Sequence, residues 1–253
     1  MFQDLRYPTD CAFDGALFWI TDRYRHQVKA LDANGNLQQC FGKFGSLPGC
    51  FQEPWGICLG DPDTLFVSDF GNQRVQKISK QNGSCLQTIG IPGPGAEYYE
   101  TPFFKTQNVF RKWTQKQSRF CTLESSFFSS GFTLGTIENP KGLAFADGKL
   151  VVADASGRLQ VFGESGALFR SHYSLESQAR NPFAFMEWVT VFRDELYWSS
   201  ELSNVIWKLG TQSQPEVFLT LPWVVGRFRF DKKGNILFMA PWEKRLYRIS
   251  FRE

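Results

Sequence analysis

The chain lacks the residues on which several classes of enzyme depend. It has only two histidines among 253 residues, His26 and His172, and no Cys/His group with the spacing of zinc ligands. It also has no G-x-S-x-G segment, the sequence signature of one class of serine nucleophile. These absences argue against a zinc lyase or a serine hydrolase of that class.

Long apolar runs and paired cysteines are also missing. No segment approaches the roughly 20 apolar residues that span a bilayer. The first residues carry an early charge and no apolar stretch, so no signal peptide is predicted. The six cysteines show no C-x-x-C spacing and favour buried free thiols, with a disulfide between Cys40 and Cys50 as the alternative. We therefore expect a cytoplasmic protein with no membrane partner.

What the chain does contain is a repeat. Prolines divide it into intervals of 38 to 48 residues, and they stand at Pro8, Pro54, Pro102, Pro140, Pro182 and Pro222. After most of them come a short apolar run, a turn, and a second apolar run such as 65–69, which reads LFVSD. Runs rich in β-branched and aromatic residues, separated by turns, predict antiparallel strands. A repeat near 40 residues that fills the chain predicts a closed circular array.

We therefore predict an all-β fold in which 1–253 is a single domain, a six-bladed β-propeller of four-stranded antiparallel blades. Each sheet would bury its faces against its neighbours. The blades would start near residues 8, 54, 102, 140, 182 and 222, and the third is predicted to be degenerate because it lacks the apolar run followed by Asp. The last repeat stops after three strands, so the residues before Tyr7 are expected to supply its outer strand and close the ring.

Two of the repeats resemble the NHL repeat. One runs from Pro54-Trp55-Gly56-Ile57 to Gln76, and the other from Pro140-Lys141-Gly142-Leu143 to Phe162. The segment 196–199, which reads LYWS, is more similar to the related YWTD propeller repeat. The resemblance covers most of the chain apart from the third repeat, and it implies a six-bladed propeller. It implies no single function, because propellers of this kind include scaffolds, RNA-binding domains, lactonases and lyases.

An aspartate ends the second apolar run in three of the repeats, at Asp22, Asp69 and Asp154. A carboxylate at this place can accept hydrogen bonds from backbone amides of its own turn. Arg74 and Arg158 follow closely enough to pair with the second and third of them. We predict a structural role for these carboxylates, and a metal-binding or catalytic role is the alternative.

The residue after each proline is expected to begin an innermost strand at the rim of the channel. Four of these six residues are aromatic: Trp55, Phe103, Phe183 and Trp223. We predict that they form a collar over a ligand, with packing between blades as the alternative. The oxygen-bearing residues Asp10, Glu53 and Asn181 lie beside the same prolines and complete the predicted ligand-binding set. No complete ligand motif is present, so no metal or cofactor is predicted, and Ca²⁺ is the cation that such oxygens would suit.

Basic residues are concentrated in two segments. Segment 105–119 holds five basic residues and no acidic one, and segment 227–252 holds eight basic and two acidic residues. Aromatic residues lie among the bases of the first, which suits backbone contact and base stacking on nucleic acid. A solvated blade edge is the alternative. The nucleic-acid candidates are Arg111, Lys112, Trp113, Lys116 and Arg119.

Three functions follow from these patterns. We predict a scaffold that binds a protein or a small ligand through the loop face at the channel mouth, because no catalytic set is evident. The alternative is an enzyme with its pocket at that mouth, either a metal-assisted lactonase or hydrolase or a lyase, whose catalytic residues the sequence does not identify. The second alternative is RNA binding through the basic segment of the third repeat, which would be sensitive to salt.

Overall fold

The computed structural model describes residues 5–92, 120–123, 135–154, 157–163, 165–174, 186–200, 203–210, 214–240 and 245–250. Over these ranges the regular structure is almost wholly β-strand. The only helical elements described are two 3-10 turns, η1 (Arg23–Arg25) and η2 (Phe70–Asn72). No helix within the described ranges has the length and apolar character needed to cross a membrane.

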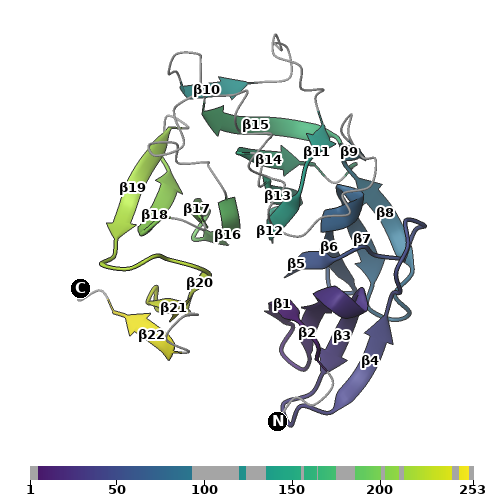
Figure 1. Cartoon of the computed structure of the whole chain (residues 1–253). Helices are drawn as coiled ribbons and strands as arrows, with labels where there is room; N and C mark the ends of the chain where they lie inside the picture. The colour runs from purple at the N-terminus through teal and green to yellow at the C-terminus, as the bar shows by residue number, and fades with distance from the viewer. Residues whose placement is uncertain are drawn as a thin grey trace.

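Antiparallel sheets are arranged radially around a centre (Figure 1). The first comprises β1 (Pro8–Phe13), β2 (Phe18–Asp22), β3 (Gln27–Leu31) and β4 (Leu37–Phe41). The second comprises β5 (Pro54–Leu59), β6 (Thr64–Asp69), β7 (Arg74–Ser79) and β8 (Cys85–Ile89). The third comprises β12 (Pro140–Ala146), β13 (Lys149–Asp154), β14 (Arg158–Phe162) and β15 (Leu168–Ser174), with β10 (Phe120–Leu123) outside β15.

Two further sheets follow. The fourth comprises β16 (Met186–Phe192), β17 (Glu195–Ser200), β18 (Val205–Leu209) and β19 (Pro215–Thr220). The fifth comprises β20 (Phe228–Phe230), β21 (Ile236–Ala240) and β22 (Arg245–Ile249). The short strands β9 (Ile91–Pro92) and β11 (Thr136–Ile137) pair in parallel. Because β1, β5, β12, β16 and β20 are innermost and each contacts the next, the described chain is a β-propeller.

The predicted count of six blades is not confirmed, because the described residues form five. The second blade packs directly on the one that begins at Pro140. The Ser68 hydroxyl donates to the Lys141 carbonyl at 2.9 Å, and a Cβ on Gly56 would lie 2.0 Å from that same oxygen. No blade fits between strands in such close contact. Of the two described strands in the predicted third repeat, β10 pairs with β15 at the outer edge and β11 pairs with β9.

Ring closure by an N-terminal strand of the last blade is also not confirmed. The backbone amides of Arg6 and Tyr7 donate to the Asp22 carboxylate of the first blade at 2.9 to 3.2 Å, which fixes them to that blade. The last blade approaches the first through Arg229. Its Nη2 lies 3.8 Å from Asp10 Oδ1 and 3.3 Å from the Cys11 carbonyl oxygen.

Four apolar clusters fill the interfaces between successive blades. Each contains at least one large ring that is 1% exposed or less: Trp19, Phe162, Trp198 and Phe228, in chain order. Flat rings suit the flat interfaces between sheets, and each buries about 150–250 Å². Much of the aromatic content of the chain therefore serves to hold neighbouring blades together.

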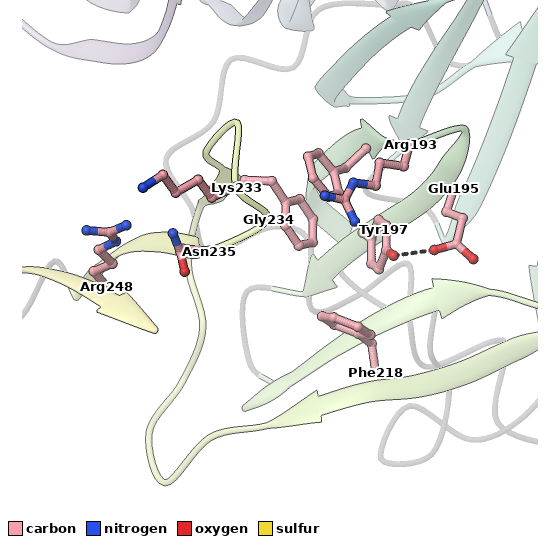
Figure 2. A pocket seen from close by; sticks show the side chains of 10 residues that line it. Arg193, Glu195, Tyr197, Phe218, Lys233, Gly234, Asn235 and Arg248 are labelled. Atoms are coloured by element: carbon pink, nitrogen blue, oxygen red, sulfur yellow. Dashed lines mark hydrogen bonds between the residues drawn. The ribbon is translucent and has the colours of Figure 1, made fainter. Parts of the chain in front are cut away.

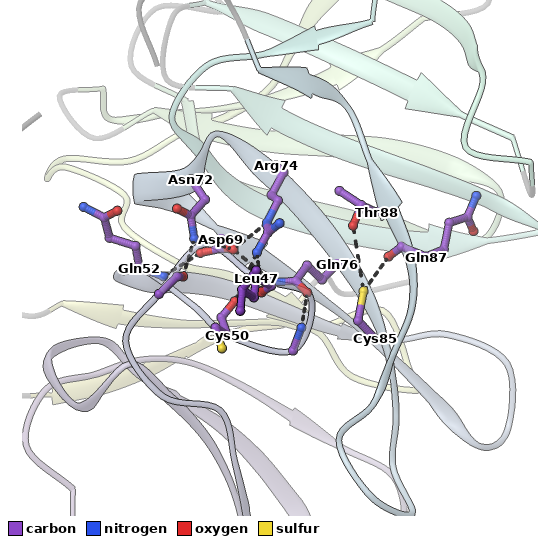
Figure 3. Close-up of polar contacts among 12 residues, drawn as sticks. Leu47, Cys50, Gln52, Asp69, Asn72, Arg74, Gln76, Cys85, Gln87 and Thr88 are labelled. Carbon is purple, nitrogen blue, oxygen red and sulfur yellow. Dashed lines mark hydrogen bonds and ion pairs between the residues drawn. The ribbon is translucent and has the colours of Figure 1, made fainter. Parts of the chain in front are cut away.

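The repeated aspartates have a structural role, as predicted, but with different donors. Buried Asp69 accepts the backbone amide of Gln52 at 2.7 Å and pairs with Arg74 Nε at 2.8 Å (Figure 3). Asp154 accepts the amide of Glu138 at 2.8 Å and pairs with Arg158. These amides belong to the segment just before the inner strand rather than to the aspartate's own turn. Each carboxylate therefore fixes the place where an inner strand begins.

The cysteines of the described side chains are free thiols, so the alternative disulfide between Cys40 and Cys50 is not formed. Cys50 and Cys58 are buried, in line with the prediction, whereas Cys11 and Cys40 are exposed. The prediction of buried thiols therefore holds for only part of the set.

Substitution of Gly56 tests the close approach of the inner strands. We expect Gly56→Ala to lower the free energy of unfolding by about 1–3 kcal/mol, because its methyl group would overlap the Lys141 carbonyl of the next blade. In the matched control, Gly163→Ala, the nearest atom is the Ala167 carbonyl oxygen at 4.0 Å, so a change of less than about 1 kcal/mol is expected. Urea unfolding measures both, and equal losses would contradict the explanation.

Candidate binding face at the channel mouth

The inner strands begin at one end of the channel, and the loops at that end hold several of the predicted site residues. Glu53 precedes the inner strand β5 and has a left-handed backbone, with φ of 53°. Its backbone amide donates to His26 Nδ1 at 3.0 Å, and the preceding amide of Gln52 is held by Asp69. These two bonds from different blades position the Glu53 side chain at the rim.

Arg23, from the turn after β2, is the centre of a cluster on this face. Its guanidinium carbon lies 4.4 Å from the centroid of the Trp55 ring, and it also faces Tyr24 at 5.3 Å, Phe70 at 5.8 Å and Tyr7 at 5.9 Å. Arg23 Nε donates to Glu53 Oε2 at 2.9 Å, and Nη2 forms an ion pair with the same oxygen. The structure therefore brings together two predicted site residues, Glu53 and Trp55, around an arginine that was not predicted.

Trp55 lies between cations from two neighbouring blades. Lys141 Nζ is 4.8 Å from its ring centroid, and Arg23 comes from the preceding blade. The Phe70 ring is tilted against it at 5.3 Å. Each such cation–π contact contributes about 0.5–2 kcal/mol, depending on solvent exposure. The ring is consequently held in one orientation at the rim.

Exposed aromatic residues extend the cluster outward. Tyr7 and Tyr24 pack together at 4.7 Å, and each is 46% exposed. Phe44, 57% exposed, packs edge-on against His26 at 5.0 Å. We call the set Tyr7, Arg23, Tyr24, Phe44 and Trp55 the aromatic–arginine patch. Three of its members, Tyr7, Tyr24 and Phe44, are exposed aromatic residues.

A second charged group lies along the inner strands. Asp10 accepts backbone amides of Ile57 at 2.8 Å and of Cys11 at 2.6 Å, and it faces Arg229. Burial raises the pKa of its carboxyl, while Arg227 and Arg229 oppose that rise. Arg229 also lies 4.2 Å from the centroid of the Trp188 ring. Both carboxylate oxygens thus have partners within the fold: Oδ2 joins the first blade to the second, and Oδ1 faces Arg229 of the last blade.

The remaining predicted residues do not join this cluster in the described part of the chain. Trp223, 38% exposed, packs on Phe238 at 6.1 Å and on Tyr247 at 5.5 Å in the last blade. Phe103, Asn181 and Phe183 lie outside the described residues, as do the nucleic-acid candidates Arg111, Lys112, Trp113, Lys116 and Arg119. Across the described ranges, no three His, Cys, Asp or Glu side chains gather as a metal site would require.

Sequence reasoning missed Tyr7, Arg23, Tyr24 and Phe44 because it followed the prolines and not the turns. One signal was available. The turn after β2 reads RYR, where the corresponding turn of the second blade reads FGN. Tyr24 and Arg25 stand where the second blade has Gly71 and Asn72, so large residues at these two places are not required by the turn geometry.

The NHL repeat family matches residues 51–78, a segment that includes Glu53 and Trp55. No curated protein matches the chain. Among solved structures, a streptogramin B lyase is 13% identical with a TM-score of 0.60, and the match covers 96% of this chain and 65% of the lyase. This chain therefore spans just under two thirds of that protein.

Other solved structures match at comparably low identity. The WD40 repeats of RRP9 are 10% identical with a TM-score of 0.60, covering 93% of this chain and 58% of that one. The glutaminyl cyclase of Myxococcus xanthus is 12% identical with a TM-score of 0.55, and the match covers 96% of this chain and 89% of the cyclase. Similarity at these identities shows the fold alone. Together the matches support a β-propeller with an NHL repeat, and they do not distinguish binding from catalysis.

Acidification should destabilise the patch through His26. Its Nδ1 accepts the Glu53 amide, and burial holds its pKa below the ordinary 6.5 although the Glu53 and Asp69 carboxylates oppose the shift. Between the folded and unfolded pKa values the unfolded chain binds more protons, so the free energy of unfolding falls as the pH drops below 6.5.

The matched variant is His26→Asn, because Asn tolerates the left-handed backbone and offers an amide oxygen in place of Nδ1 without titrating. We expect the midpoint temperature of thermal unfolding to fall less steeply between pH 7 and pH 5 in the variant than in the parent. An NMR titration that placed the His26 pKa above 6.5 would contradict the assignment.

Proposed function

We propose that this propeller is a binding scaffold, and that a protein segment bearing apolar and acidic side chains docks on the aromatic–arginine patch at the channel mouth. The observation that carries the proposal is the arrangement around Arg23, which faces four aromatic rings, two of them on tyrosines that are each 46% exposed. In this proposal 1–253 acts as one domain.

The composition of the patch supports a protein partner. Trp, Tyr and Arg are the residues most enriched among those that dominate the binding energy of protein interfaces. Arg23 is only 17% exposed and is fixed by Glu53, so little side-chain freedom remains to be lost on binding. The exposed rings Tyr7, Tyr24 and Phe44 supply the apolar area.

The charges around the patch support an acidic partner. Arg6, Arg25 and Lys43 are exposed at its edge. Two carboxylates close to the patch already have partners: Glu53 pairs with Arg23, and buried Asp22 pairs with Lys29 at 3.3 Å and lies 3.8 Å from Arg25 Nε. The edge is therefore net positive, and acidic side chains flanking an apolar anchor would complement it.

A catalytic pocket at the channel mouth is the second candidate, and Asp10 is the observation that favours it. A buried carboxyl with a raised pKa beside two arginines is a feature that active sites share. However, its oxygens already accept two backbone amides, so the side chain has a structural task that accounts for its burial. RNA binding through 105–119 and a cytoplasmic location stay predictions.

The test is site-specific photocrosslinking followed by affinity measurement. A benzophenone side chain placed at Tyr24 should capture a partner from an extract of the source cells that the same group placed at Phe169 does not. Phe169 is the matched control because it is 54% exposed, contacts Lys149 and Arg170, and lies on β15 of another blade.

Affinity for the captured partner, once purified, decides the proposal. We expect Tyr24→Ala and Phe44→Ala each to weaken binding by about tenfold or more, as substitutions at interface anchors do. Phe169→Ala should change it less than about twofold. Binding that is equally strong in all three variants would refute docking at the patch, and a partner with no acidic side chains in the crosslinked segment would refute its stated chemistry.

A further inference from the structure

A pocket of about 580 Å³ lies between the fourth and fifth blades (Figure 2). It is formed where the inner strands β16 and β20 end and turn into β17 and β21, so it lies at the opposite end of the channel from the aromatic–arginine patch. Its volume is within the range of about 300–1,000 Å³ that is typical of small-molecule sites. None of the residues proposed for partner binding lines it.

Aromatic rings form the floor of this pocket. Phe192 and Phe230, from neighbouring blades, stack at 4.5 Å with an angle of 13° between their planes. Tyr197 packs on Phe230 at 4.7 Å and on Phe218 at 4.9 Å. The three phenylalanines are partly exposed, whereas Tyr197 is buried. The floor therefore presents ring surface to whatever enters.

Cations form the rim. Arg193, Lys233 and Arg248 are exposed and line the same pocket, and Figure 2 shows Arg193 near Tyr197 with Lys233 and Arg248 on the other side of Gly234. Arg193 lies 5.1 Å from the centroid of the Phe192 ring, so charge and ring surface are adjacent. Among the described ion pairs none involves Arg193 or Lys233, while Arg248 pairs with Asp231 at 3.1 Å.

Glu195 and Asp231, two carboxylates near the rim, already have partners, and Asp194, next to Arg193 in the chain, is exposed and does not line the pocket. Glu195 forms an ion pair with Lys208 and accepts the Tyr197 hydroxyl at 2.6 Å, and these contacts lower the pKa of its carboxyl. Asp231 accepts the backbone amides of Lys233 and Asn235 at 2.8 and 2.9 Å, besides the Asn235 side chain. Neither carboxylate is therefore available to neutralise Arg193 or Lys233, and the rim stays positive.

We propose that this pocket binds a small planar aromatic anion. The ring of the ligand would stack on the exposed surface of Phe192, Phe218 or Phe230, and its carboxylate or phosphate would be held by Arg193 and Lys233. Hydrogen bonds between charged groups are stronger than neutral ones, and a ring adds stacking area beyond simple burial. The site is independent of partner docking, because the two lie at opposite ends of the channel.

Calorimetric titration with paired probes tests the chemistry. Indole-3-acetate and AMP carry a ring with a carboxylate or a phosphate, while indole-3-ethanol and adenosine carry the ring alone. We expect at least one anion to bind about tenfold more tightly than its neutral partner, and raised salt to reduce the difference. Which anion binds identifies the acid group as carboxylate or phosphate. Failure of both anions to bind, or equal binding of anion and neutral partner, would overturn the proposal.

Two lysines on one turn provide the matched control. Lys232 and Lys233 are both exposed, but only Lys233 lines the pocket. Lys233→Gln and Arg193→Gln should each lower the affinity for the anion about fivefold or more, whereas Lys232→Gln should leave that affinity unchanged. Phe218→Leu should lower the affinity for the anion and for its neutral partner by the same factor, because the substitution removes a ring and no charge. Equal effects of the two lysine substitutions would show nonspecific attraction and refute the site.

Discussion

A buried carboxylate at the end of the second strand determines where the inner strand begins in the first three blades of the ring. Burying an isolated charge costs many kcal/mol, and the cost is offset only when hydrogen bonds and a counter-charge surround it. Asp69 has both, with the Gln52 amide on one side and Arg74 on the other. The loop ahead of the strand is thereby fixed, and Glu53, the residue after Gln52, is held where it meets Arg23 of the neighbouring blade.

Much of this fold could be predicted from the sequence, because strands and turns are specified by residues that are close together in the chain. The second strands, the aspartates and their arginines stand where the repeat indicated. The predicted six blades are not confirmed, because proline was taken to mark every inner strand and the described residues form five blades. Proline is tolerated at the start of a strand but equally in a loop. Pro182 and Pro222 precede β16 and β20 by several residues, and Pro102 begins no described strand.

The candidate site was predictable only in part, for a different reason. Glu53 and Trp55 belong to one repeat, and their position beside a proline placed them at the channel mouth. Arg23 belongs to the preceding repeat, and its contact with Trp55 depends on how two blades pack. Cation–π contacts between neighbouring blades recur at Arg229 and Trp188. A single sequence holds no record of such pairs, since nothing in their spacing along the chain links them.

The junction between the last and first blades differs from the others. Four interfaces contain a cluster of buried apolar side chains, whereas the described contacts at the fifth are those of Arg229 with Asp10 and the Cys11 carbonyl. In an array where each unit contacts only its neighbours, stability is close to a sum of the neighbouring interfaces. An interface with fewer apolar contacts would be the one at which such a ring opens most readily. Amide hydrogens near this junction would exchange with solvent sooner than those of β12 and β13, which lie between two apolar interfaces.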